Sequence, residues 1–130
     1  ASDVYKRQDK MINIGFVSSR EAIREIYSVA DVMVNCTREE SLSLLNVEVQ
    51  ACGTPIITYS NTGVKETVDG KCGFAVENGN SEAMWSMAAD VLLKGKECFE
   101  GDCISWTKQT FDRNQNYIKY IELYKNLISN

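Results

Sequence analysis

The stretch Asn35–Pro55, NCTREESLSLLNVEVQACGTP, decides the fold because it passes from a strand through a polar loop into an apolar helix. The apolar run 32–36 predicts a short buried strand, and the hydroxyl and charged side chains of 37–43 predict a loop. Residues 44–52 have helical character, and Gly53 stands where a helix typically ends. The helix therefore begins beside the carboxyl end of a strand, where α/β sheets bind ligands and free backbone N–H groups favour anions.

The rest of the chain continues this alternation of strands and helices. Strands are expected at 11–17, 31–36, 56–59 and 74–76, and helices at 18–30, 44–52, 65–68, 81–94, near Trp106 and from Asp112 onward. Such an alternation is typical of right-handed crossovers and a parallel sheet. The sequence thus predicts an α/β fold with a Rossmann-like parallel sheet flanked by helices.

Two of the predicted helices have recognisable starts. Ser18 is followed three residues later by Glu21, which predicts a capping box for the first helix. The apolar stripe of this helix is expected to cover one face of the sheet. Ser81 is expected to cap the helix 81–94, and Met84 and Trp85 on its apolar stripe are assigned to the core.

The two ends of the chain differ in character. Residues 1–10 are polar and carry no period, so they are interpreted as a leader or a cloning remnant outside a domain that spans 11–130. Asp112, with Gln115 three residues later, predicts the start of the last helix. The apolar face of that helix is expected to be partly exposed.

Composition narrows the class of protein. The 130 residues suffice for one domain, and 44% apolar and 25% charged residues are ordinary for a globular protein. The net charge of −4 gives no reason to expect nucleic acid, and no apolar run has the length of a membrane span. Five cysteines without a C-x-x-C pair predict free thiols, and the absence of histidine argues against a Ser-His nucleophile and most zinc sites.

Four short motifs follow one another in the order typical of one enzyme family. Glu40 and Glu48 have seven residues between them, and ACGTP follows at 51–55. TGVKE at 62–66 is similar to a Gly-Gly-x-x-Glu segment, and DGKCGF at 69–74 to an Asp-Gly-x-x-Gly-aliphatic turn. With these motifs the chain resembles the family-4 retaining glycosyltransferases of the GT-B fold.

The resemblance implies a site for a nucleoside diphosphate sugar. Glu40 would be the catalytic residue and accept hydrogen bonds from hydroxyls of the donor sugar, and Glu48 would accept them from the ribose, since carboxylates only accept. The helix N-terminus would stabilise the departing diphosphate with no metal or other cofactor, and the sequence contains no Asp-x-Asp. The donor-binding residues implied are Glu40, Ser41, Leu42, Ser43, Leu44, Glu48 and Gly63.

These residues also have ordinary interpretations. Glu48 could be a solvated helix residue, and Glu40 could be half of a surface pair with Arg38. Gly63 is expected to have a positive φ or to let the backbone approach the ligand closely. The ordinary interpretation is that Gly63 is a turn glycine without a functional role. The segment Ser41–Ser43 departs from the family's Gly-Phe-Gly, which leaves the conformation of the loop open.

The function implied is hexosyl transfer from a nucleoside diphosphate sugar to a glycan or lipid-linked acceptor, in bacterial polysaccharide assembly. Family members begin this domain with a βαβ portion and bind the acceptor in another domain. This sequence contains no stretch that resembles the βαβ portion or the acceptor-binding domain. It is therefore predicted to be the C-terminal part of a GT-B nucleotide-binding domain, truncated at its N-terminal side and inactive alone. The full-length protein is expected in the cytoplasm, with peripheral contact to the inner face of the membrane. The alternatives are a non-catalytic nucleotide-sugar-binding module and a GT-B-type sugar-nucleotide epimerase.

Overall fold

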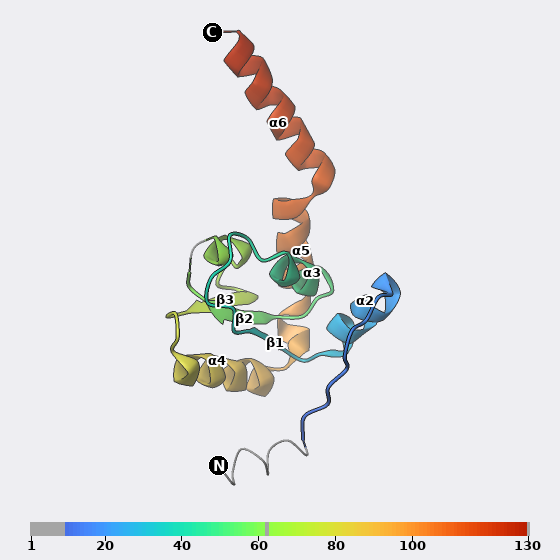
Figure 1. Ribbon diagram of the computed structural model, residues 1–130, viewed down its shortest axis with the longest axis vertical. Coiled ribbons are helices and arrows are strands. Elements are labelled where there is room, and N and C mark those ends of the chain that lie inside the picture. Colours follow the sequence, from blue (N-terminus) through green and yellow to red (C-terminus); the bar gives the residue numbers. More distant parts are fainter. Residues whose placement is uncertain (1–9, 62, 130) are drawn as a thin grey trace.

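A computed structural model describes residues 10–61 and 63–129 of the chain, so most of the predicted leader 1–10 lies outside the described residues. Within them, three parallel strands form one sheet in the order β1-β2-β3 (Figure 1). Because the strands run in the same direction, their carboxyl ends meet at one edge. This confirms the predicted α/β architecture. The strands are β1 Met33–Asn35, β2 Ile56–Tyr59 and β3 Gly73–Val76.

Helices lie on both sides of this sheet, with α3 above it and α4 below it in the view of Figure 1. The last helix, α6, extends away from the sheet and ends far from it. The helices are α2 Arg20–Val29, α3 Leu44–Ala51, α4 Ser81–Lys94, α5 Glu100–Phe111 and α6 Arg113–Ile128, with short 3-10 helices η1 Val64–Thr67 and η2 Lys96–Cys98. No helix among the described residues is long and apolar enough to cross a membrane.

Strand β2 is the centre of two buried layers. Because side chains alternate along a strand, Ile57 and Tyr59 face one side and Ile56 the other. The first pair belongs to a core cluster with Met84, Ala88 and Val91 of α4. This cluster also contains Cys72, Phe99 and Cys103, and the ring of Phe74 meets that of Phe99 edge-on at 6.0 Å.

The stretch from α3 to β2 folds as the sequence predicts. Helix α3 begins at Leu44, and Glu48 lies one turn inside it. Gly53 follows with a φ of +79°, a conformation that glycine adopts at little cost, and its N–H donates to the carbonyl of Gln50 at 2.9 Å. Thr54 Oγ1 then donates to the carbonyl of Tyr27 at 2.5 Å, which ties the end of α2 to this turn.

The prediction of a strand at 11–17 is wrong. These residues form no strand, and the side chains of Met11, Ile12 and Phe16 are 75%, 90% and 95% exposed. A strand is stable only when a neighbouring strand takes up its backbone hydrogen bonds. An apolar run has the composition of a strand, but composition does not supply the partner.

Two predictions for the first helix are also wrong. Ser19, one residue later than the predicted Ser18, caps α2, and its Oγ accepts from the N–H of Ala22 at 3.3 Å. The helix packs against α3 instead of covering the sheet, and none of its residues is fully buried. Periodicity identifies an apolar stripe, whereas the neighbour of that stripe is set by the rest of the fold.

Helix α4 has the predicted bounds but a different cap and a narrower core face. Asn80, rather than Ser81, is the cap, because its Oδ1 accepts from the N–H of Ala83 at 2.9 Å. Met84 is buried as predicted, whereas Trp85 is 61% exposed, which corrects its assignment to the core. Adjacent helical residues point about 100° apart, so a helix that packs on one side buries Met84 and not Trp85.

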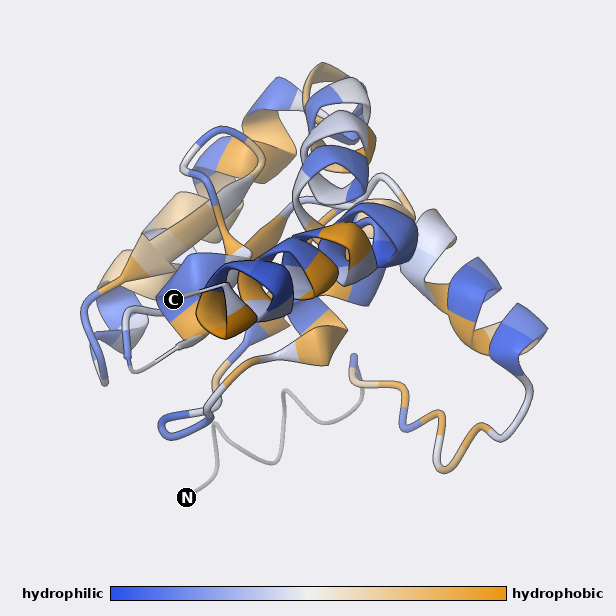
Figure 2. Cartoon of the chain, turned by 90° about the horizontal axis from the view of Figure 1, so that it is seen from above, coloured by the Kyte–Doolittle hydropathy of each residue, from blue (hydrophilic) through white to orange (hydrophobic). Residues whose placement is uncertain are grey.

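The C-terminal third is more helical than predicted. Only a short helix near Trp106 was expected, but α5 is 12 residues long, and the Trp106 ring lies 5.4 Å from that of Phe111. The cap of α6 is confirmed: Asp112 Oδ1 accepts from the N–H of Gln115 at 2.8 Å. The expected exposure of its apolar face is also confirmed, since none of its residues is buried. Hydrophobic and hydrophilic residues alternate in colour along the helices in Figure 2.

Asp69 holds the turn that leads into β3. Its Oδ1 accepts hydrogen bonds from the backbone N–H groups of Lys71 at 2.9 Å and Cys72 at 3.1 Å. Burial raises the pKa of Asp69, but the hydrogen bonds from backbone N–H groups outweigh burial, so its pKa in the folded protein is lowered. The ionised carboxylate therefore stabilises this turn.

Acid should weaken the fold through Asp69. The pKa of Asp69 is lower in the folded than in the unfolded chain. Asp69 therefore stabilises the fold at pH values above its unfolded-state pKa of about 4. This stability is lost as the pH falls through the folded-state pKa. We expect Asp69→Ala to lower the free energy of unfolding by about 1 kcal/mol at pH 7 and by a smaller amount at pH 3. The loss is small because solvent screens the partly exposed carboxylate. Urea unfolding at both pH values tests this, and equal losses would contradict it.

Candidate functional site

The loop 37–43 lies at the carboxyl edge of the sheet, between β1 and α3. Glu40 is half-buried in this loop. Ser43 takes the N-cap position of α3 but makes no side-chain cap; its buried Oγ instead accepts from Asn35 Nδ2 at 3.1 Å. Leu44, the first helical residue, is 63% exposed. The predicted residues here are therefore a buried Ser43, a half-buried Glu40, and the exposed Ser41, Leu42 and Leu44.

Gly63 lies against the loop. Its φ is −79°, so the interpretation that it provides a positive φ is wrong. A Cβ at this position would collide with the carbonyl oxygen of Ser41 and lie 2.9 Å from the carbonyl carbon. The close approach that Gly63 allows is thus to the protein's own loop. Thr62, the first residue of the TGVKE motif, lies outside the described residues.

A buried network of amides and hydroxyls lies beneath the loop. Asn35 Nδ2 donates to Asn46 Oδ1 at 2.9 Å, and Asn46 Nδ2 donates to Thr67 Oγ1 at 2.8 Å. Gln50 Nε2 donates to the carbonyls of Asn46 at 2.8 Å and Thr67 at 2.7 Å. Sequence reasoning missed these residues. The available signal was two amide side chains, Asn46 and Gln50, within a helix whose other residues except Glu48 are apolar.

Asn61 holds the first part of the loop. Its Nδ2 donates to the carbonyl of Thr37 at 3.1 Å and also to that of Arg38. Among the described residues, Asn61 Oδ1 and Thr58 Oγ1 are buried without a hydrogen-bond partner. Since Thr58 lies beside Asn35 in the sheet register, both unpaired oxygens lie at the carboxyl end of β2, near the loop. Buried oxygens without partners are uncommon, so this end of β2 has unused hydrogen-bonding capacity.

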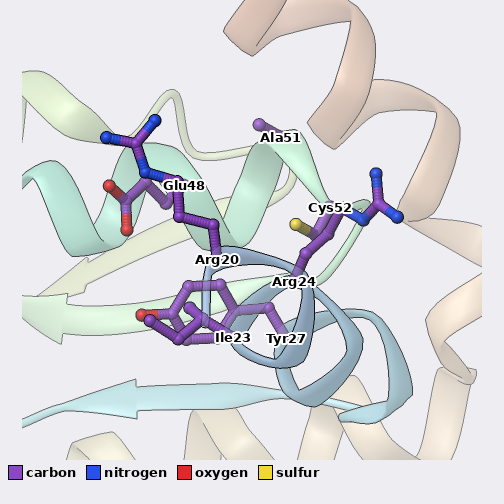
Figure 3. Close-up of a pocket in the computed structure, with 7 residues that line it drawn as sticks. All are labelled: Arg20, Ile23, Arg24, Tyr27, Glu48, Ala51 and Cys52. Carbon is purple, nitrogen blue, oxygen red and sulfur yellow. The ribbon is translucent and has the colours of Figure 1, made fainter. Parts of the chain in front are cut away.

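Glu48 projects from the outer side of α3 into a cleft of about 410 Å³ between α2 and α3 (Figure 3). Arg20 extends towards Glu48 and Arg24 towards Cys52 in this view. Burial raises the pKa of Tyr27 in the same cleft, and the neighbouring Glu48 carboxylate raises it further. The lining residues are Arg20, Ile23, Arg24, Tyr27, Glu48, Ala51 and Cys52.

The chemistry of this cleft suits a polyhydroxylated anion. Glu48 can accept hydrogen bonds from hydroxyl groups, and the guanidinium groups of Arg20 and Arg24 can pair with phosphate oxygens. Glu48 also lines a second cleft of about 400 Å³ on its other side, where Lys108 and Arg113 supply further positive charge. Both clefts that Glu48 lines are therefore also lined by positively charged residues, although the chain has a net charge of −4.

None of the other predicted site residues lines the two clefts that Glu48 lines, although Leu44 lies one helical turn from Glu48 on α3. Leu42, 40% exposed, lines a cleft of about 430 Å³ that it shares with Phe111 and with Tyr120 and Leu123 of α6. The structure thus brings Ser41 together with Gly63, and places Leu42 and Glu48 in different clefts. Among the described residues, no group of three or more His, Cys, Asp or Glu side chains is placed to hold a metal ion.

Comparisons with known proteins bear on this arrangement. The model of the family "Glycosyl transferases group 1" matches residues 2–94. D-inositol 3-phosphate glycosyltransferase from Mycobacterium sp. (strain KMS) is 37% identical over 76 residues, which are 58% of this chain and 17% of that protein. The same enzyme from Mycobacterium marinum is 32% identical over 88 residues, 67% of this chain and 19% of that protein.

One solved structure shares the fold. Sucrose-phosphate synthase from Thermosynechococcus elongatus superposes with a TM-score of 0.80 at 22% identity, covering 98% of this chain and 32% of that chain. At this level of identity the likeness concerns the fold alone. The chain spans about a sixth of the length of the curated relatives it matches and about a third of the structural neighbour.

Proposed function

We propose a donor-binding role for this chain, which belongs to the family of glycosyl transferases group 1. In this proposal the chain is the donor-binding part of a retaining, hexosyltransferase-type enzyme. The enzyme transfers the sugar of a nucleoside diphosphate sugar to a glycan or lipid-linked acceptor. One observation carries the proposal: the loop with Glu40 and the helix with Glu48 meet at the carboxyl edge of a parallel sheet, where α/β proteins bind nucleotides.

The proposed roles follow from the position of each group. Glu48 accepts hydrogen bonds from the ribose, and its cleft supplies Arg20 and Arg24 for the anionic part of the ligand. Glu40 accepts hydrogen bonds from the donor sugar and is the catalytic residue. The free N–H groups at the start of α3 stabilise the negative charge that builds on the departing diphosphate, which removes the need for a metal ion.

The rest of the reaction is assigned to a longer protein. Because this chain spans 17% of a D-inositol 3-phosphate glycosyltransferase, we propose that it does not catalyse transfer alone and that the acceptor is bound by another domain. The intact protein would act in the bacterial cytoplasm in polysaccharide assembly, and at the inner face of the membrane when its acceptor is lipid-linked. Sugar transfer catalysed by the 130-residue chain itself would contradict the proposal that the chain does not catalyse transfer alone.

Nucleotide binding by the intact protein tests the assignment of Glu48. We expect calorimetric titration with UDP, GDP and ADP to show one preferred nucleotide, and Glu48→Ala to weaken its binding by about 10- to 100-fold, because hydrogen bonds to a charged group are lost. Glu82→Ala, which removes an exposed carboxylate from α4, should leave the affinity unchanged. Equal affinity of wild type and Glu48→Ala would remove Glu48 from the site.

Product analysis separates the proposal from its alternatives. A transferase converts the nucleoside diphosphate sugar only when an acceptor is present, and the product keeps the anomeric configuration of the donor. A non-catalytic module binds the donor and leaves it intact. A sugar-nucleotide epimerase changes the sugar without any acceptor, so the three outcomes are distinct by chromatography of the nucleotide products.

A further inference from the structure

We infer that Asn46 is a positioning residue that sets the conformation of the loop carrying Glu40, an inference that rests on the proposed function. Asn46 is fully buried on α3 and hydrogen-bonds both to Asn35 at the end of β1 and to Thr67 in η1. These segments frame the loop: Asn35 precedes it, and η1 follows Gly63, which lies against Ser41. Asn46 therefore joins the structural elements on either side of the site.

The direction of each hydrogen bond in this network is fixed by chemistry. Thr67 Oγ1 donates to the carbonyl of Val64 at 2.6 Å, so it accepts from Asn46 Nδ2. Asn46 Oδ1 is then free to accept from Asn35 Nδ2, and Asn35 Oδ1 accepts from the N–H of Thr37 at 3.0 Å. Only a side chain with one donor and one acceptor fits between Asn35 and Thr67, a requirement that asparagine meets and leucine or aspartate does not.

The network reaches the loop at both of its ends. Asn35 Nδ2 also donates to Ser43 Oγ at 3.1 Å, so the last loop residue is held by the same amide that Asn46 orients. Without Asn46, the amide of Asn35 can turn and release Thr37 and Ser43 together. The loop between them contains Glu40, so the position of the Glu40 carboxylate would change with the loop.

Asn46 acts on the loop and not on the cleft that holds Glu48. The two residues are two positions apart on α3, or about 200° around the helix, so Asn46 faces inward where Glu48 faces outward. Val49 and Gln50, both fully buried, also anchor α3, and Gln50 contacts the backbone carbonyl of Asn46 and not its side chain. Loss of the Asn46 side chain should therefore impair the alignment of the donor sugar more than the binding of the nucleotide.

Gln50 provides a matched control. Like Asn46, it is a fully buried amide on α3, and its Nε2 makes hydrogen bonds to two carbonyls, those of Asn46 and Thr67. None of the hydrogen bonds described for Gln50 involves residues 35–43. Asn46→Leu and Gln50→Leu should therefore lower the urea midpoint of unfolding by similar amounts but differ in their effect on the loop.

Transfer kinetics of the intact protein give the first test. We expect Asn46→Leu to lower kcat by about 10- to 100-fold with KM for the donor changed by less than about threefold, since misalignment acts on the reacting geometry. Gln50→Leu should keep kcat within about threefold of wild type. Ser43→Ala removes one hydrogen-bond acceptor from the network with little change in volume. This variant should also lower kcat, and it replaces Asn46→Leu in the test if Asn46→Leu does not fold. Equal kcat for the Asn46 and Gln50 variants would overturn the inference.

Amide hydrogen exchange gives a second test that needs no activity. Asn46→Leu and Ser43→Ala should speed exchange in residues 37–43 by at least about tenfold relative to wild type, whereas Gln50→Leu should not. If the wild-type protein transfers no sugar, the proposed function fails, but the exchange pattern still decides whether Asn46 positions the loop. Unchanged exchange in 37–43 would overturn the inference even in an active enzyme.

Discussion

Gly63→Ala is expected to destabilise the protein by about 2–4 kcal/mol and to displace the loop with Glu40. The added methyl group would collide with the carbonyl oxygen of Ser41, a backbone atom that cannot swing away as a flexible side chain does. Relief requires that η1 or the loop move, and either movement strains the buried hydrogen bonds of Thr67 or Asn35. The free energy of unfolding measured in urea, together with transfer activity, would show both effects.

Gly101→Ala is the matched control for this substitution. Gly101 lies in α5, has no heavy atom within 4 Å of the place of a new Cβ, and its backbone is helical. Alanine is the better helix former by about 1 kcal/mol, so this substitution should stabilise the protein. Opposite signs for the two glycines are thus expected, and a loss below 1 kcal/mol for Gly63→Ala would show that the loop yields to the methyl group.

Glu40→Gln should lower kcat/KM for sugar transfer by about 10- to 100-fold in the intact protein, with nucleotide affinity nearly unchanged. Glutamine has the size of glutamate but carries no charge and presents only one acceptor oxygen, so hydrogen bonds from the sugar hydroxyls are weakened or lost. The nucleotide is proposed to bind at Glu48, which lies on the helix outside this loop. Steady-state kinetics combined with nucleotide titration would separate these two effects.

Glu39→Gln tests whether the position of the carboxylate matters or only its charge. Glu39 is exposed, whereas its neighbour Glu40 is half-buried. The same change of charge one residue earlier should alter kcat/KM by less than about twofold, because an exposed charge is screened by solvent. If both variants lost activity equally, the effect would be one of overall charge, and Glu40 would not be the catalytic residue.

Local patterns predicted the elements whose ends depend on their own residues. The bounds of α3 and α4 follow from apolar periodicity between a polar start and a glycine, and Asp112 caps α6 through a contact three residues away. Predictions failed where a neighbour decides the outcome. Residues 11–17 have the composition of a strand but no strand beside them, and Trp85 lies next to a core stripe without belonging to it.

The sequence by itself determined the α/β fold, the family, and the place of Glu40 in a loop and Glu48 on a helix, because these rest on short motifs and the spacing of apolar residues. The tertiary structure decided that Gly63 lies against Ser41, that Asn46 joins Asn35 to Thr67, and that Glu48 shares a cleft with Arg20 and Arg24 of α2. These contacts join residues far apart in the chain. Their geometry depends on how the helices pack on the sheet, which no local pattern specifies.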